Sequence, residues 1–125
     1  MSEKHPERLL PADRLTRARD FARVRGNGVA FRGRTCLLMV LSAAGERSRV
    51  GFIASRRGVG GAVQRNRARR RLREIVRRRW GRVPAEGFLL VFIASRSTLQ
   101  ASHQALATDV ENLLAHAGAL APLPV

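Results

Sequence analysis

One segment, QRNRARRRLREIVRRRW (residues 64–80), constrains the fold of this chain more than any other. Nine of its seventeen residues are arginine, and only Glu74 is acidic. At 100° per residue, a helix gathers its apolar side chains into an arc of about 140°, wide enough to pack on a sheet. That arc contains Ala68, Leu72, Ile75, Val76 and Trp80. The segment therefore predicts an amphipathic helix with an apolar side and a cationic side.

The cationic side needs a separate explanation, because like charges on a helix repel each other by a few tenths of a kcal/mol per pair. Solvated helix faces usually mix charges of both signs, and this one has a single acid. The pattern favours a polyanion as partner over a merely solvated face. The stripe consists of Asn66, Arg70, Arg73 and Arg77, with Arg67 beside it, whereas Arg69 and Arg79 fall inside the apolar arc.

The whole chain repeats this imbalance. It has 24 basic and 9 acidic residues and a formal charge of +15, and Lys4 is its only lysine. A polyanion would relieve this self-repulsion, so nucleic acid is the first candidate partner and an anionic membrane surface the second. Arginine favours nucleic acid because its planar fork pairs with phosphate and stacks on bases. A GC-rich genome would equally explain the choice of arginine over lysine, but not the net charge.

A length of 125 residues predicts one domain. We expect a loose polar segment at 1–13, one α+β domain at 14–118 and an irregular tail at 119–125. Apolar runs and glycine positions predict the order α-β-β-α-β-α, with an additional short strand near Phe31, as an α-β sandwich. Thr16 is the expected N-cap of the first helix, and a polar turn at 43–48 should join two strands as an antiparallel hairpin. The expected elements are helices at 16–25, 62–80 and 102–117, and strands at 34–42, 49–55 and 88–95.

The loop RRGVGG (residues 56–61) precedes the arginine helix. A plain turn explains such a loop, and it lacks the nucleotide-binding pattern G-x-x-x-x-G-K-[ST]. At a helix start it also offers free backbone N–H groups and a positive dipole end. Because Arg56, Arg57, Arg65 and Arg67 surround it, a phosphodiester could bind there, beside the simpler explanation of a plain turn.

The sequence predicts no catalytic residue and no metal site on the protein. The acids are scattered, and His5, His103 and His116 lie away from the basic element. Cys36 stands alone in an apolar run and reads as a small buried hydrophobe. No apolar run approaches the ~18 residues that a membrane span needs. We expect a cytoplasmic protein with no membrane partner.

The segment SRRGVGGAVQRNRARRRLRE (residues 55–74) resembles the signature of the bacterial ribonuclease P protein subunit. The N-terminal stretch RLTRARDFARVRGNG also resembles that family. The residues that carry the resemblance are Arg14, Leu15, Asp20, Phe21, Val24, Gly28, Ser55, Arg56, Arg57, Gly60, Ala62, Val63, Arg65, Asn66, Arg67, Arg69, Arg70, Arg73 and Glu74.

The resemblance implies an accessory subunit of an enzyme whose catalytic RNA, with Mg²⁺, removes the 5′ leader of precursor tRNA. The protein would bind no cofactor itself, and DNA is not an expected partner. The resemblance also implies a left-handed β-α-β crossover. The alternative is a ribosomal or other structural RNA-binding protein of similar composition, without a role in cleavage.

Two groups of residues receive roles from the resemblance. Residues expected to contact the catalytic RNA are Arg56, Arg57, Arg65, Asn66, Arg67, Arg69, Arg70 and Arg73. The cleft for the single-stranded leader would contain Phe21, Arg25 and Phe31, with Phe21 as the best stacking platform and Phe31 as a weaker one. From the residues alone, a place in the core explains Phe21 equally well. Many relatives have an aromatic residue where this chain has Arg25, and often another near Met39. Leader stacking is therefore expected to be weaker here.

Overall fold

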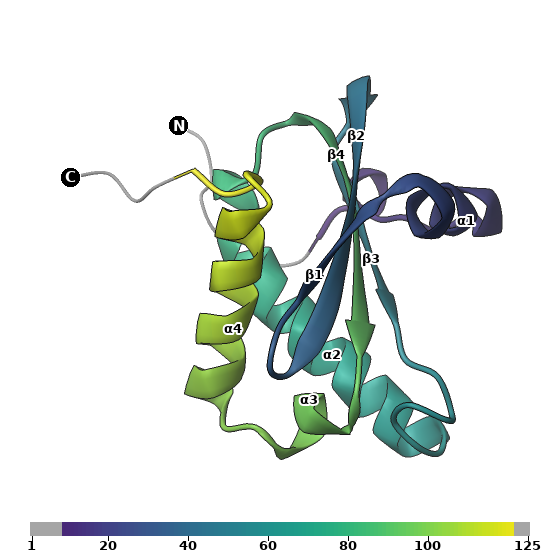
Figure 1. The fold of residues 1–125 in the computed structure, drawn as a ribbon, viewed down its shortest axis with the longest axis vertical. Helices are drawn as coiled ribbons and strands as arrows, with labels where there is room; N and C mark the ends of the chain where they lie inside the picture. The colour runs from purple at the N-terminus through teal and green to yellow at the C-terminus, as the bar shows by residue number, and fades with distance from the viewer. Residues whose placement is uncertain (1–8, 122–125) are drawn as a thin grey trace.

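The computed structural model describes residues 9–121, which form one mixed four-stranded sheet with helices on both faces (Figure 1). The predicted α+β class is confirmed. In chain order the elements are η1 (Pro11–Asp13), α1 (Ala18–Asn27), β1 (Val29–Arg32), β2 (Cys36–Arg47), β3 (Arg49–Ile53), α2 (Ala62–Arg79), η2 (Trp80–Arg82), β4 (Glu86–Ala94), α3 (Arg96–Gln100) and α4 (His103–His116).

The strands lie in the order β1-β2-β4-β3, so the predicted hairpin between the second and third strands is wrong. The antiparallel hairpin joins β1 to β2, which confirms the additional short strand near Phe31. β4 separates β2 from β3 and pairs antiparallel with the first and parallel with the second. The reason is burial: the side chains of Leu90, Val91 and Phe92 are fully buried, and a strand buried on both faces takes a central place in a sheet.

β2 also continues through residues 43–47, where a polar turn was predicted. The long strand accommodates these turn-forming residues through Gly45, at φ +82°, and through a register shift between Ala43 and Arg47. α2 joins the adjacent parallel strands β3 and β4, which makes β3-α2-β4 a crossover unit. Its left hand stays a prediction, because pairing order does not fix handedness.

The sheet separates two apolar clusters. On one face, α2 and α4 pack over the larger cluster, and the predicted apolar arc of α2 lies in it. Ala68, Leu72, Ile75 and Val76 are buried there, and Trp80 is partly buried against the same cluster. On the other face, α1 packs over a smaller cluster that includes Leu15, Val24 and Val91. The two helical layers thus give the sheet two unlike faces.

Helix ends were predicted unevenly. The last helix begins near Ser102 as expected: this residue caps α4, its hydroxyl accepting a hydrogen bond from the Ala105 amide at 3.1 Å, and Gly118 follows the helix at φ +74°. Thr16 is not the cap of α1, because the helix begins two residues later and Arg17 occupies that position without a side-chain cap.

The ends of the chain are described only in part. Residues 1–8 and 122–125, which hold most of the predicted loose segment and tail, lie outside the described residues. Residues 9–13 belong to the fold, because Leu9 is buried in the larger cluster and Pro11–Asp13 form η1. The Ala121 amide donates to the Arg82 carbonyl at 2.9 Å, so the chain is held to the domain up to that point.

Candidate nucleic-acid interface

The loop before α2 is folded upon itself. The Gly58 amide donates to the Ser55 hydroxyl at 2.9 Å, and Val59 is buried beneath the loop. Gly60 adopts φ +140°, a conformation that other residues rarely take. α2 then begins after Gly61, which offers no side-chain cap, and its first turn contains no acid. The first amides of α2 and the positive end of its dipole therefore face outward without a side-chain acceptor.

Arginine side chains line this loop and the first three turns of α2. Arg56, Arg57, Arg67 and Arg70 are exposed, and Arg65, Arg69 and Arg73 are half-buried. Within residues 9–121, none of these seven forms an ion pair with a carboxylate. With exposed Asn66, they form what we call the arginine face, and all eight predicted residues lie on it. No carboxylate of residues 9–121 pairs with its positive charge.

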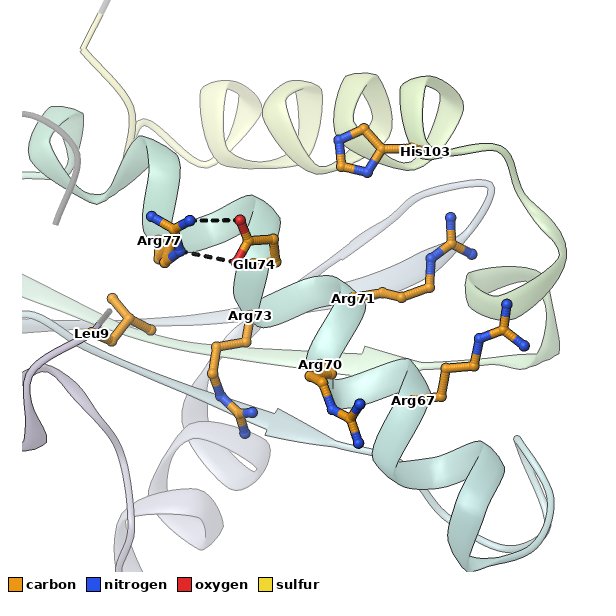
Figure 2. Close-up of a pocket in the computed structure, with 8 residues that line it drawn as sticks. All are labelled: Leu9, Arg67, Arg70, Arg71, Arg73, Glu74, Arg77 and His103. Carbon is orange, nitrogen blue, oxygen red and sulfur yellow. Dashed lines mark hydrogen bonds and ion pairs between the residues drawn. The ribbon is translucent and has the colours of Figure 1, made fainter. Parts of the chain in front are cut away.

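A hollow of about 460 Å³ crosses the arginine face. Figure 2 shows the guanidinium groups of Arg70 and Arg73 pointing to the same side of α2, with Arg67 one turn nearer the loop. The hollow ends where Glu74 accepts hydrogen bonds from Arg77 at 2.9 and 2.6 Å. Arg77, the last member of the predicted stripe, is thus ion-paired, and the uncompensated part of the stripe ends at Arg73.

Arg73 is held in place by an aromatic ring. Its guanidinium carbon lies 5.5 Å from the centroid of Phe52, and Phe52 stacks on Phe92 with centroids 6.0 Å apart. Burial lowers the pKa of Arg73, and the charges of Arg14, Arg69 and Arg70 lower it further. The group remains protonated at neutral pH, but an anion beside it would be strongly favoured.

Asn66 and Arg69 form a second fixed pair. Arg69 donates to the Asn66 side-chain oxygen at 2.6 Å and extends to the Ala54 carbonyl at 3.5 Å. This explains how Arg69 fits inside the apolar arc: its side chain runs past the apolar edge to the end of β3. Because the Asn66 oxygen accepts from Arg69, its amide N–H groups remain to donate outward.

Other arginines of α2 have structural roles that the sequence did not reveal. Arg71 donates to the carbonyls of Thr98, Leu99 and Ala101 at 2.7–3.0 Å and so fixes the end of α3. Arg79, the second arginine in the apolar arc, pairs with Glu111 of α4 at 2.9 Å. A helical wheel gives the direction of a side chain but not the residue that it contacts. The sequence therefore could not distinguish Arg71 and Arg79 from the residues of the arginine face.

The sheet face beside α1 is apolar and only partly covered. Phe21, Met39, Leu41, Ile53 and Ile93 pack around the smaller cluster while remaining partly exposed, and we call them the open apolar face. Phe21 lies directly over β3: a Cβ at residue 51 would be 2.5 Å from two carbons of its ring, so Gly51 permits the contact. Ile53 ends β3 and leads directly into the loop of the arginine face.

The three residues predicted for the leader cleft are not all brought together. Phe21 lies on the open apolar face, and Arg25 is exposed in the last turn of the same helix. Phe31 pairs with Leu38 and packs on the larger cluster, on the opposite side of the sheet. Sequence periodicity could not assign this face, because β1 has only four residues, mostly exposed.

Groups that perform protein-based hydrolysis are dispersed. Among residues 9–121, no three His, Cys, Asp or Glu side chains gather where they could hold a metal ion. Burial raises the pKa of the Cys36 thiol to about 12, so it stays protonated. His103 borders the hollow on the arginine face, so the expectation that it lies away from the basic element is wrong, whereas His116 ends α4. No helix in this part of the chain has the length and apolar character required to cross a bilayer.

Comparison with known proteins gives one consistent result. The family model Ribonuclease P matches residues 9–118. The chain is 45% identical over 114 residues to the ribonuclease P protein component of Chloroflexus aurantiacus, covering 90% of this chain and 82% of that one. The component from Symbiobacterium thermophilum is 42% identical over 113 residues, covering 90% and 96%.

The fold agrees as well. The solved ribonuclease P protein of Thermotoga maritima aligns with a TM-score of 0.71 at 28% identity, covering 82% of this chain and 96% of that one. Nothing in these matches favours the ribosomal alternative. The arginine face, the fold and the relatives lead to one assignment: the chain belongs to the ribonuclease P protein family and is a protein component of that ribonucleoprotein endoribonuclease.

Proposed function

We propose that the arginine face binds the catalytic RNA of ribonuclease P, which is the RNA partner that family membership implies. The observation that carries this proposal is the absence of carboxylate partners for its seven arginines within residues 9–121. Phosphates would supply the missing negative charge, bound by the guanidinium forks and by the first amides of α2. Asn66 differs from its neighbours, because its outward N–H groups can contact an RNA acceptor without adding charge.

The open apolar face receives the 5′ leader of precursor tRNA in this proposal. Single strands bind where cationic groups accompany stacking platforms. Phe21 offers a half-exposed ring, and Arg25 follows one helical turn later as the cationic neighbour. Ile53, at the end of β3, and its partner Ile93 extend the apolar surface toward the loop of the arginine face, so a leader lying here would approach the catalytic RNA. Phe31 has no part in this cleft, because it packs on the other side of the sheet.

The division of labour follows from the side chains. The protein contributes positioning and charge neutralisation, and the RNA, with its Mg²⁺, carries the hydrolysis of the phosphodiester. The dispersed carboxylates and histidines of the described residues support this part of the proposal. The reaction would take place in the cytoplasm, on precursor tRNA.

A reconstitution assay tests the proposed function. Purified protein is added to a ribonuclease P RNA at an Mg²⁺ concentration too low for the RNA to act efficiently alone, and cleavage of precursor tRNA is followed. We expect the protein to restore cleavage at the mature 5′ end. A protein that binds the RNA but leaves cleavage unchanged would contradict the proposal and favour a purely structural role.

A further inference from the structure

A further arginine lies beside the arginine face but belongs to a different part of the chain. Arg14 follows η1 and forms an isolated parallel bridge with Val50 at the outer edge of β3. The next residue confirms this alignment, since the Leu15 amide donates to the Val50 carbonyl at 2.9 Å. The N-terminal segment thus runs along the free edge of the sheet.

The register decides which way Arg14 points. Paired residues of neighbouring strands project to the same face, and successive residues to opposite faces. Val50 lies in the larger cluster beneath α2, and Leu15 lies in the smaller cluster beneath α1. The Arg14 side chain therefore projects to the α2 side, next to Val50 and one pleat from Phe52, the residue that carries Arg73.

Two observations indicate that Arg14 lacks a ligand. Among residues 9–121, the buried side-chain nitrogen and oxygen atoms without a hydrogen-bond partner are the Nε atoms of Arg14 and Arg65. Buried donors in native proteins are nearly always satisfied, so an orphan donor points to a missing partner. In addition, Arg14 forms no ion pair in this part of the chain, and its charge is the first of the three arginine charges that lower the pKa of Arg73. Two like charges held close together favour an anion between them.

We propose that Arg14 and Arg73 together bind one phosphate of the ribonuclease P RNA, extending the RNA-binding surface from α2 across the edge of β3 toward α1. This inference rests on the proposed function of the arginine face. It assigns to the N-terminal segment a direct RNA contact. A phosphodiester fits because its two non-bridging oxygens can each accept from one guanidinium group. Because Leu15 and Phe21 lie just beyond this edge, the RNA bound by α2 and the open apolar face would meet here.

A double-mutant cycle with full-length protein and ribonuclease P RNA tests whether Arg14 and Arg73 share one phosphate. We expect Arg14→Gln and Arg73→Gln each to weaken RNA binding by roughly ten-fold. The double variant should fall well short of the hundred-fold product, because the two groups share one ligand. Its log–log salt slope should decrease by about 0.7–0.9, the value for a single phosphate contact. If the double variant instead loses the full hundred-fold in affinity, with about twice that change in slope, the two arginines bind separate phosphates and the proposal is overturned.

Controls separate this inference from the proposed function. Arg70→Gln should flatten the salt slope whether or not Arg14 contacts RNA, so an unchanged slope in that variant counts against the arginine face itself. An unchanged slope and affinity in Arg14→Gln alone overturns only the present inference. Arg82→Gln, which removes a charge at the far end of α2, should bind RNA as the wild type does.

The midpoint of thermal unfolding of Arg14→Gln should be unchanged or raised, since like-charge repulsion is removed. A lowered midpoint would assign Arg14 a structural role instead. Arg14→Lys, which keeps the charge, should retain most of the slope.

Discussion

Arginines occur in two regions of this molecule with opposite surroundings. On the arginine face, seven arginines have no carboxylate partner within residues 9–121. On the side of α1, Arg23 and Arg49 share two acids: Asp20, at 3.3 and 3.1 Å, and Glu46, at 2.8 and 3.1 Å. These four residues, which we call the α1 clasp, tie α1 to β2 and β3. Charge is balanced in one region and left open in the other.

The difference shows that composition alone does not define a binding surface. A net charge of +15 is spread over the chain, but several of its acids pair with structural arginines, as in the α1 clasp and the Arg79–Glu111 pair. What marks the arginine face is the position of the acids, not the number of arginines. The clasp holds α1, and with it Phe21, over the sheet, so the balanced region supports the proposed leader site.

The largest expected effect comes from breaking the clasp. The Asp20 carboxylate is buried in the first turn of α1, where it also faces the positive end of the helix dipole. Asp20→Ala removes a partner from both clasp arginines, and we expect the free energy of unfolding to fall by about 2–3 kcal/mol. Chemical denaturation measures this. Glu86→Ala, which removes an exposed acid with no ion pair in the described chain, should change stability by less than about 0.5 kcal/mol. Equal effects of the two would contradict the clasp.

The arginine face should respond in the opposite manner. Arg67 and Arg70 are exposed and make no ion pair within residues 9–121, whereas Arg73 also packs on Phe52. Arg67→Ala/Arg70→Ala should therefore leave the stability of the free protein unchanged or slightly raised. Binding to ribonuclease P RNA should weaken, with a salt slope shallower by about 1.4–1.8 if both contact phosphates. RNA affinity measured across a salt series gives the slope, and thermal unfolding gives the stability of the free protein. A destabilised protein with an unchanged slope would make the face structural.

The sequence predicted the arginine face better than the sheet. The helix at 62–80 was found almost to the residue because its apolar arc and cationic stripe share the helical period, and the loop before it is marked by glycines. The sheet order was not predictable in this way. β2 and β3 are neighbours along the chain, yet the greater burial of β4 places it between them. Arg71 and Arg79 show the same limit, because an arginine's partner lies in tertiary structure.

For a related reason, the sequence could not show that Phe21 and Phe31 lie on opposite sides of the sheet. The sequence explains Phe21 equally as a stacking platform and as a core residue. In the structure its ring is partly exposed on α1, and Gly51, over which it lies, is on a strand thirty residues away. Phe31 was a second, weaker candidate for the cleft that the resemblance implies, and a short, mostly exposed strand gives no periodicity that would assign its face. The structure thus separates the two phenylalanines: Phe21 stays the proposed leader contact, and Phe31, on the opposite side of the sheet, serves as its control.

That pair provides the next prediction. Phe21→Leu keeps an apolar side chain over Gly51 but removes the aromatic surface, and stacking on one base contributes ~1–3 kcal/mol. We expect precursor tRNA to bind the reconstituted holoenzyme roughly ten-fold more weakly, while binding of mature tRNA, which has no leader, stays the same. Phe31→Leu, on the opposite side of the sheet, should bind both RNAs as the wild type does. If the two variants weaken precursor binding equally, Phe21 is not a specific leader contact.

The smallest expected effect concerns the pH dependence of stability, which should be seen for the α1 clasp and not for the arginine face. Hydrogen bonds from Arg23, and the charges of Arg23 and Arg49, hold the pKa of the Glu46 carboxyl below its ordinary value. In the unfolded chain the same group titrates near about 4.3. The folded state therefore binds fewer protons in this range, and the stability that Glu46 contributes is fully present above the unfolded pKa. It is lost as the pH falls through the lower, folded-state pKa.

We expect the difference in thermal midpoint between wild type and Glu46→Gln to be constant from about pH 7 to about pH 5 and to shrink at lower pH. Arg70→Ala, which touches no carboxylate in the described chain, should show no such convergence. A difference that persists undiminished in acid would mean that Glu46 acts through packing and not through its charge, and the contrast between a balanced and an open arginine region would lose its electrostatic basis.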